Sequence, residues 1–260
     1  MKNTYFPLIF LFCIALNLKS QKSFTTGMVQ YKQTIMIDTV LNIMKETIGT
    51  LYFDTDKHQS LYVWDRKNFN YRSEFKKMED GTVRQVQPNG NAGTDTIGRR
   101  IYKQFDSPIV FAREKLGQWF LVSDTIVIKW DIKDETKTSY NMTLQKAIGD
   151  FHGRRYTVWF NPLFPLSDGP WKFKGIPGLI IEAYDEKNHV KFDFISMTIP
   201  ATFQETLSKP EGYNTLYYSQ YLEKKIKAIN EAPKVFESQI KQRGGSVSGS
   251  LRTNIIERSN

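Results

Sequence analysis

The sequence contains only one cysteine, Cys13, and three histidines, and it has no long apolar run beyond residues 1–20. Because Cys13 lies in a segment that we expect to be removed, the remaining chain can form no disulfide, thiolate nucleophile or cysteine metal site. The histidines, His58, His152 and His189, show no metal-ligand spacing. The sequence therefore predicts no metal site and no cofactor.

The first 20 residues have the pattern of a secretory signal. Lys2 supplies a positive start, and the apolar run from Tyr5 to Leu18 is shorter than the about 20 residues that a membrane-spanning helix needs. We expect cleavage after Ser20. The sequence thus predicts an exported protein of the periplasm, the outer membrane or the medium.

The formal net charge is +9, from 36 basic and 27 acidic residues. The basic residues are scattered along the chain and form only short pairs, such as Arg154-Arg155. Charge of this kind first favours solubility, and an exported protein does not meet nucleic acid in the cytoplasm. We predict a solvated, mildly basic surface and no nucleic-acid partner.

Alternation of apolar and polar residues dominates the middle of the chain. In 156-YTVWFN-161 and 189-HVKFDFISM-197, every second residue is apolar, which is typical of strands with one buried face. Similar runs occupy 27–37, 48–53, 60–64, 99–105, 118–122 and 126–130. A sheet of this size must curl or fold into two layers. We predict a mainly β protein with a C-terminal helix, built on a large curved antiparallel sheet that resembles a half-barrel, with a β-sandwich as the alternative.

The C-terminal part of the chain has a helical pattern. Residues 216–232 carry apolar positions at helical spacing, Pro233 is expected to break the helix, and 234–242 to continue as a second one. We expect the helix to cover the concave face of the sheet. Residues 78–97 read as a long loop. The organisation that we predict is a signal at 1–20, a single domain at 21–242 and a flexible tail at 243–260.

The stretch 169-GPWKFKGIPGLIIEA-183 concentrates glycine and proline before an apolar run. A phosphate-binding loop would lead into a helix, but 179–184 has the composition of a strand. A nucleophile elbow needs a serine, which the stretch lacks. The remaining interpretation is a structural corner, with Pro177 and Gly178 in a type II turn. Trp171 and Phe173 would pack inward from a long crossover that runs from Asn161 to a central strand.

These residues resemble the GLPGLI family, exported proteins of Gram-negative bacteria whose molecular function is not established. The family motif corresponds to Gly175-Ile176-Pro177-Gly178-Leu179-Ile180, with isoleucine at the second position. Further matches are Gly169, Pro170 and Phe173, together with Gly153-Arg154, Tyr156 and Trp159-Phe160. The resemblance covers about 128–198. It implies an envelope or secreted location, gives these motif residues a structural role and supplies no catalytic residue.

Three residues are candidates for ligand binding: Trp159, Trp171 and Glu182. The tryptophans belong to an aromatic-rich sheet, and Glu182 lies inside an apolar run where burial would raise its pKa. The sequence favours a non-enzymatic envelope protein that binds a lipid, another apolar or amphipathic ligand, or a membrane partner. No oligomeric state is predicted.

Two other functions remain open at this point. The chain could be an accessory subunit of an outer-membrane transporter that binds through an exposed strand edge. It could also be a peptide or glycan hydrolase that uses Glu182, Asp168 or Asp185 with a histidine.

Overall fold

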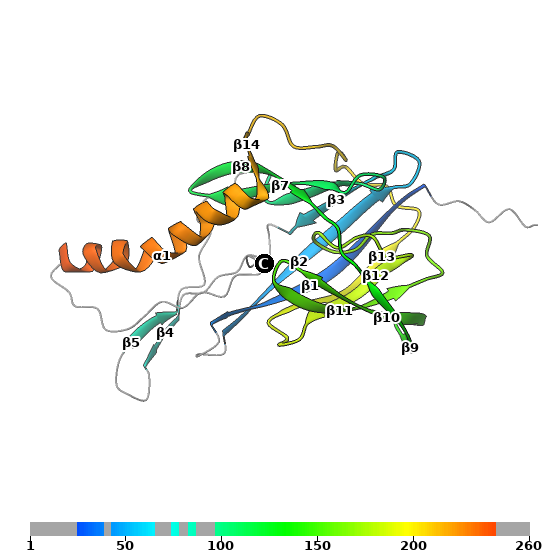
Figure 1. The fold of residues 1–260 in the computed structure, drawn as a ribbon, viewed down its shortest axis with the longest axis horizontal. Coiled ribbons are helices and arrows are strands. Elements are labelled where there is room, and N and C mark those ends of the chain that lie inside the picture. The colour runs from blue at the N-terminus through cyan, green and yellow to red at the C-terminus, as the bar shows by residue number, and fades with distance from the viewer. Residues whose placement is uncertain (1–24, 39–42, 66–73, 78–82, 87–96, 243–260) are drawn as a thin grey trace, which may run out of the picture.

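The computed structural model describes residues 25–38, 43–65, 74–77, 83–86 and 97–242 (Figure 1). The predicted signal at 1–20, the predicted tail at 243–260 and most of the predicted loop at 78–97 lie outside these residues. The strands are β1 (Thr26–Asp38), β2 (Ile43–Asp54), β3 (Gln59–Trp64), β4 (Glu74–Lys77), β5 (Val83–Val86), β6 (Arg100–Gln104), β7 (Ile109–Leu116), β8 (Gln118–Thr125), β9 (Asp131–Ser139), β10 (Met142–Phe151), β11 (Arg154–Asn161), β12 (Leu179–Asp185), β13 (Val190–Thr198) and β14 (Asn214–Tyr217), and they are followed by one helix, α1 (Tyr218–Gln242).

Twelve of these strands form one open sheet in the order β14-β8-β7-β6-β3-β2-β1-β13-β12-β11-β10-β9, and β4 and β5 form a separate hairpin. β1 lies in the middle of this sheet. The strands from β1 to β8 run outward on one side of it, and β13 to β9 on the other. All described pairs are antiparallel except β14 with β8. The prediction of a mainly β fold with one large curved sheet and a C-terminal helix is confirmed (Figure 1).

The strands form where alternation gives each one a buried face. In β11, Tyr156, Val158 and Phe160 are buried, while the residues between them are more exposed. β12 differs, because its first five residues are all buried and the strand is therefore covered on both faces. The buried residues of both halves of the sheet join in one hydrophobic cluster on what we call the inner face.

The opposite, outer face of β3 and β6 is covered by a strap, residues 199–213, which runs from the end of β13 to β14. Ala201 pairs its backbone with Thr26 at one end of the strap. Leu207 packs against a small second cluster of Leu61, Val63 and Tyr102. The strap explains why β3 is buried on both faces.

The helix differs from the prediction in two ways. It is a single helix from Tyr218 to Gln242 that continues through Pro233, so the predicted break is wrong. It does not cover the concave face: its first turns lie beside β8 and β14, and it then leads away from the sheet (Figure 1). Tyr221 and Leu222 are buried at this root.

Residues 126–130 were also predicted as a strand, but they form the connection from β8, which lies next to the edge strand β14, to β9 at the opposite edge of the sheet. The connection crosses the inner face. A side chain at Gly149 of β10 would lie 2.8 Å from atoms of Ile128 and Trp130. The alternation of 126–130 therefore reflects alternating burial without strand pairing.

Candidate functional site

Residues 162–178 connect β11 to β12 and fill the inner face of the sheet; we call them the plug. Trp171 and Phe173, at 2% and 0% exposure, enter the central aromatic cluster as predicted. The Trp171 ring stacks on Phe192 with centroids 6.2 Å apart, and Phe173 meets Tyr156 edge-on at 4.9 Å. Because β11 and β12 are direct neighbours, the predicted crossover is instead a wide hairpin connection.

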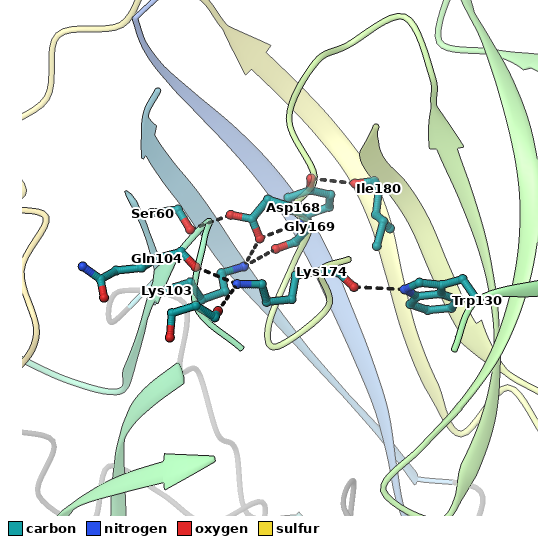
Figure 2. A network of polar contacts seen from close by, with 10 residues as sticks. Ser60, Lys103, Gln104, Trp130, Asp168, Gly169, Lys174 and Ile180 are labelled. Atoms are coloured by element: carbon teal, nitrogen blue, oxygen red, sulfur yellow. Dashed lines mark hydrogen bonds and ion pairs between the residues drawn. The ribbon is translucent and has the colours of Figure 1, made fainter. Parts of the chain in front are cut away.

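A buried ion pair anchors the plug to the opposite half of the sheet (Figure 2). The Lys103 ammonium group, on β6, contacts the Asp168 carboxylate and donates to the Gly169 carbonyl oxygen at 2.8 Å. The Ser60 hydroxyl donates to the second oxygen of Asp168. Lys103 and Asp168 are 0% and 1% exposed. Burial lowers the pKa of Lys103, and the Asp168 carboxylate opposes that shift.

Lys174 makes a second anchor beside the first. Its ammonium group donates to the carbonyl oxygens of Gln104 and Ser107 at 2.6 and 2.7 Å. Its own carbonyl accepts the indole N–H of Trp130 at 2.9 Å, from the connection that crosses the inner face (Figure 2). Lys174 thus links the plug to the end of β6 and the turn after it, and also to the connection between β8 and β9.

The motif residues form the end of the plug and the start of β12. Gly178 N–H donates to the Ile176 carbonyl at 2.9 Å, a three-residue turn around Pro177 that replaces the predicted type II turn. Gly178 has a φ of 147°, and a Cβ there would lie 2.3 Å from the Asn161 carbonyl oxygen. Glycine is therefore required by both conformation and space. The remaining buried motif residues are Gly169, Pro170, Phe173, Ile176, Leu179 and Ile180.

A second charged cluster joins the plug to the root of helix α1. Lys172 and His152 both contact the same carboxylate oxygen of Asp124, at 2.9 Å each. The His152 ring lies 4.1 Å from the ring of Tyr218, the first residue of α1. Burial raises the pKa of Asp124, but the hydrogen bonds and charges of His152 and Lys172 outweigh it and lower that pKa overall.

The three predicted ligand residues lie in two places. Trp171 belongs to the filled interior, as described above. Trp159 and Glu182 are cross-strand partners on β11 and β12. Lys137 of β9 joins them, with its ammonium group 2.6 Å from the Glu182 carboxylate and 4.6 Å from the centroid of the Trp159 ring. The structure therefore brings Trp159 and Glu182 together, and Lys137 contacts both of them.

Each of the three acidic residues that were candidates for hydrolysis forms an ion pair with a lysine or arginine side chain. Glu182 meets Lys137, Asp168 meets Lys103, and the Asp185 carboxylate lies 2.6 Å from the Arg154 guanidinium. The histidines that contact carboxylates do so elsewhere, His152 with Asp124 and His58 with Asp106. These contacts give all three acids structural partners. Within the described ranges, no group of three or more His, Cys, Asp or Glu residues is arranged to hold a metal ion.

Sequence reasoning missed a polar cluster on the inner faces of β1, β2 and β3. Gln33 and Tyr62 are both 0% exposed, and Thr47 and Trp64 surround them at 5% and 8%. The signal was present as polar residues at inward positions, but only the strand register places them together. We call Gln33, Thr47, Tyr62 and Trp64 the Gln33 cluster.

An open groove of about 360 Å³ lies between the strap and the ends of β1 to β3. Asp54, Gln59, Phe203 and Glu205 are among its lining residues. Glu205 is held 3.5 Å from the Arg100 guanidinium. Because the groove is shallow and its charges are paired within the protein, it defines no specific ligand.

No protein-family model matches the chain, and no curated protein matches its sequence significantly. Among solved structures, the chain is similar to PNGF-II in two crystal forms, with 11% and 12% identity and a TM-score of 0.49 in both. The matches cover 77% and 76% of this chain but 33% and 32% of the PNGF-II chain, so the chain spans about a third of that protein. An uncharacterised conserved protein from Thermus thermophilus matches at 8% identity and a TM-score of 0.39, over 74% of this chain and 90% of its own. Similarities this distant carry no functional argument.

Proposed function

We propose that the protein is an exported, non-enzymatic component of a bacterial cell envelope, and that it docks to the membrane through helix α1. The observation that carries this proposal is the position of the helix. α1 has 25 residues, a length of about 37 Å at the usual rise. Only the first turns of α1 lie against the sheet, and the rest of the helix leads away from it (Figure 1).

The exposed side of α1 carries lysines together with two glutamates, Glu223 and Glu231, and the Lys227 ammonium group lies 4.0 Å from the Glu231 carboxylate. Lys224 and Lys227 are exposed and Lys225 is half-buried, while Ile226 and Ile229 are half-buried on the neighbouring side. A helix with basic residues beside an apolar row can lie at the surface of an anionic membrane, where each basic residue adds about 1 kcal/mol. No helix in the described part of the chain is long and apolar enough to span a bilayer.

The filled interior supports docking over ligand transport. A lipid carrier needs an apolar space, and here the plug places Trp171, Phe173 and Ile176 in it, all at 2% exposure or less. The buried pair of Lys103 and Asp168 fixes the plug in that position. Displacement of the plug by a lipid would separate this pair and leave two buried charges without each other.

The experiment is flotation of the protein with lipid vesicles. We expect binding to vesicles that contain phosphatidylglycerol, weak binding to phosphatidylcholine alone, and loss of binding when Lys224, Lys225 and Lys227 are all changed to Glu. The matched control changes three exposed lysines on the body, Lys57, Lys129 and Lys187, to Glu and alters the net charge equally. Equal loss in both variants, or no binding to either vesicle, would reject membrane docking by α1.

The accessory-subunit function has one specific observation in its favour. β9 forms an outer edge of the sheet and pairs only with β10 among the described strands. However, Asp131, Lys133, Asp134, Glu135 and Lys137 make this edge highly charged, which is typical of edges protected against strand addition. Binding to native envelope membranes but not to pure lipid vesicles, with loss on disruption of β9, would favour this function.

A further inference from the structure

The strap lies on the outer face as an extended segment. Exposure alternates from Thr202 to Ser208, and every second residue is half-buried against the sheet, namely Phe203, Glu205 and Leu207. A period of two places successive side chains on opposite sides of an extended chain. The backbone N–H and C=O groups of the strap therefore point sideways, along the surface of the sheet.

The half-buried side chains of the strap contact different strands. The Phe203 ring lies 5.0 Å from the ring of Tyr52 on β2, measured between centroids. The Glu205 carboxylate lies 3.5 Å from the Arg100 guanidinium on β6, and Leu207 packs on the small cluster of β3 and β6. The strap thus crosses these strands and is held there by side chains.

The backbone of the strap has free hydrogen-bonding groups along part of its length. Its backbone bonds join Ala201 to Thr26 at one end and Ser208 to Thr206 further along. Among the residues that the structure describes, the backbone groups of 202–205 form no hydrogen bond with one another or with the sheet. An extended segment with unpaired backbone groups is an edge to which another chain can add.

The open groove described above runs beside this edge. Six of the seven residues from 201 to 207 line one wall, and the ends of β1 to β3, with Thr26, Asp54 and Gln59, line the other. The groove has a volume of about 360 Å³, at the lower end of the range of about 300–1,000 Å³ for ligand sites. Its charges are paired, so it selects no particular side chain, whereas a wall of backbone can recognise any extended peptide.

The strap lacks the features that protect the edge strand β9. β9 carries five charged residues, which oppose the addition of another strand. Residues 201–208 contain no proline and a single charge, Glu205, which is directed at Arg100. The exposed Thr202 and Thr206 are β-branched and favour an extended chain. The strap is therefore the more accessible edge of the two.

We propose that the groove beside the strap binds an extended peptide segment of another protein, which pairs its backbone with residues 202–205. The peptide lies between the strap and the ends of β1 to β3, and the two chains form a two-stranded ribbon over the outer face. Every peptide carries the N–H and C=O groups that this pairing needs, so the groove requires no unpaired charge. The surface is separate from α1, and the proposal does not depend on membrane docking.

The test uses the full exported chain and a blocked hexapeptide of alternating threonine and valine as the probe. Nuclear magnetic resonance should show saturable shifts of the strap amides, and hydrogen exchange of these amides should slow as they become paired. The control is the same hexapeptide methylated at every backbone nitrogen, which keeps the side chains and loses the donors. Its affinity should be at least about tenfold weaker, because several hydrogen bonds are lost together.

A matched pair of strap variants locates the site. Thr206 and Gln204 are both exposed on the strap, but only Thr206 lines the groove. Thr206→Trp places a large ring in the groove and should weaken hexapeptide binding about tenfold or more, whereas Gln204→Trp should leave it unchanged. Both variants should unfold cooperatively near the Tm of the unchanged protein, since both positions are exposed.

Three outcomes would overturn the proposal. The first is equal affinity of the unchanged protein for the methylated and unmethylated hexapeptides, a comparison that needs no variant to fold. The second is equal binding by Thr206→Trp and Gln204→Trp. The third is the absence of shifts at the strap amides, including the case in which the shifts occur at β9 or β14 instead. A crystal structure with the hexapeptide paired along the strap would support the proposal directly.

Discussion

The buried ion pair of the plug and the Gln33 cluster, both on the inner face, differ in how completely their polar groups are paired. At the plug, Lys103 and Asp168 are almost fully buried and each has protein partners. At the Gln33 cluster, Gln33 and Tyr62 are equally buried, yet each keeps a donor without an acceptor among the described residues. Burial is the same in both places, and only the completeness of pairing differs.

This difference predicts the effect of a substitution on stability better than burial does. A paired, buried ion pair fixes one arrangement of the chain, because separating it exposes two charges to a low-dielectric interior. A buried donor without a partner costs free energy, and removing that donor can be neutral or stabilising. We therefore expect changes at the buried ion pair to destabilise the fold strongly, and removal of an unpaired donor from the Gln33 cluster to change stability little.

The largest expected effect is at the buried ion pair. Lys103→Met leaves the Asp168 carboxylate buried without its cation, and we expect the free energy of unfolding to fall by about 3–5 kcal/mol. Urea denaturation followed by circular dichroism measures this loss.

The double variant Lys103→Met with Asp168→Leu is the control for the buried charge. Removing both charges should recover part of the loss, since the cost arises from an unpaired charge more than from a missing attraction. If the free energy of unfolding of the double variant is instead lower than that of Lys103→Met, Asp168 stabilises the fold mainly through its hydrogen bonds to Ser60 and the plug backbone.

Two motif glycines give a matched pair of smaller effects. Gly178→Ala should cost about 3 kcal/mol, because its backbone conformation is unfavourable for alanine and its Cβ would collide with the Asn161 carbonyl. Gly175 has a φ of 85° but open space around it, so Gly175→Ala should cost only about 1 kcal/mol. Thermal unfolding measures both, and equal costs would mean that conformation alone decides.

Much of the fold could be predicted from the sequence because most strands have one buried face. β11 and β13 alternate clearly, and both were predicted within a residue or two of their observed ends. β9 was not predicted. Its sequence, DIKDETKTS, lies at an exposed edge and has almost no apolar residue to signal a buried face.

The plug could be predicted only in part. The inward position of Trp171 and Phe173 follows from their size and alternation. Lys172 and Lys174 alternate with these aromatic residues, yet they are buried as well, at 2% and 8% exposure. Their burial depends on partners that are distant in sequence, such as Asp124, and no local pattern indicates these partners.

The candidate sites show the same limit. Trp159 and Glu182 were predicted individually, but their shared lysine follows from the β9 position, which was not predicted. Gln33 and Tyr62 lie on strands whose pairing partners are set by register. A slip of one residue would turn either side chain to the other face. The Gln33 cluster is therefore a property of the register and could not be read from either strand alone.

The third prediction concerns the pH dependence of the cluster that joins the plug to α1. The pKa of Asp124 is lowered in the folded state, so its ionised form stabilises the fold above the unfolded value of 3.8. This stabilisation is lost as the pH falls below that value through the lower folded pKa. Asp124→Asn should reduce the free energy of unfolding by about 1–2 kcal/mol at pH 7, and the difference from the unchanged protein should shrink toward about pH 3.

Urea midpoints of the two proteins across this pH range measure the difference. A constant difference from pH 7 to about pH 3 would mean that the carboxylate charge does not stabilise the cluster and that Asp124 acts only as a hydrogen-bond acceptor. Glu135→Gln, at an exposed acid on β9, is a control that should have little effect at any pH.

The smallest effects test the comparison most directly, because they remove one paired and one unpaired hydroxyl group from two neighbouring tyrosines, whose ring centroids are 6.5 Å apart. The Tyr31 hydroxyl donates to the Ile180 carbonyl at 2.8 Å, so Tyr31→Phe should cost about 1–1.5 kcal/mol and leave that carbonyl without its donor. The Tyr62 hydroxyl has no partner among the described residues, so Tyr62→Phe should be neutral or slightly stabilising. Urea denaturation of both variants measures the two changes. If Tyr62→Phe instead costs as much as Tyr31→Phe, the Tyr62 hydroxyl is already satisfied, and the two clusters do not differ in the completeness of their pairing.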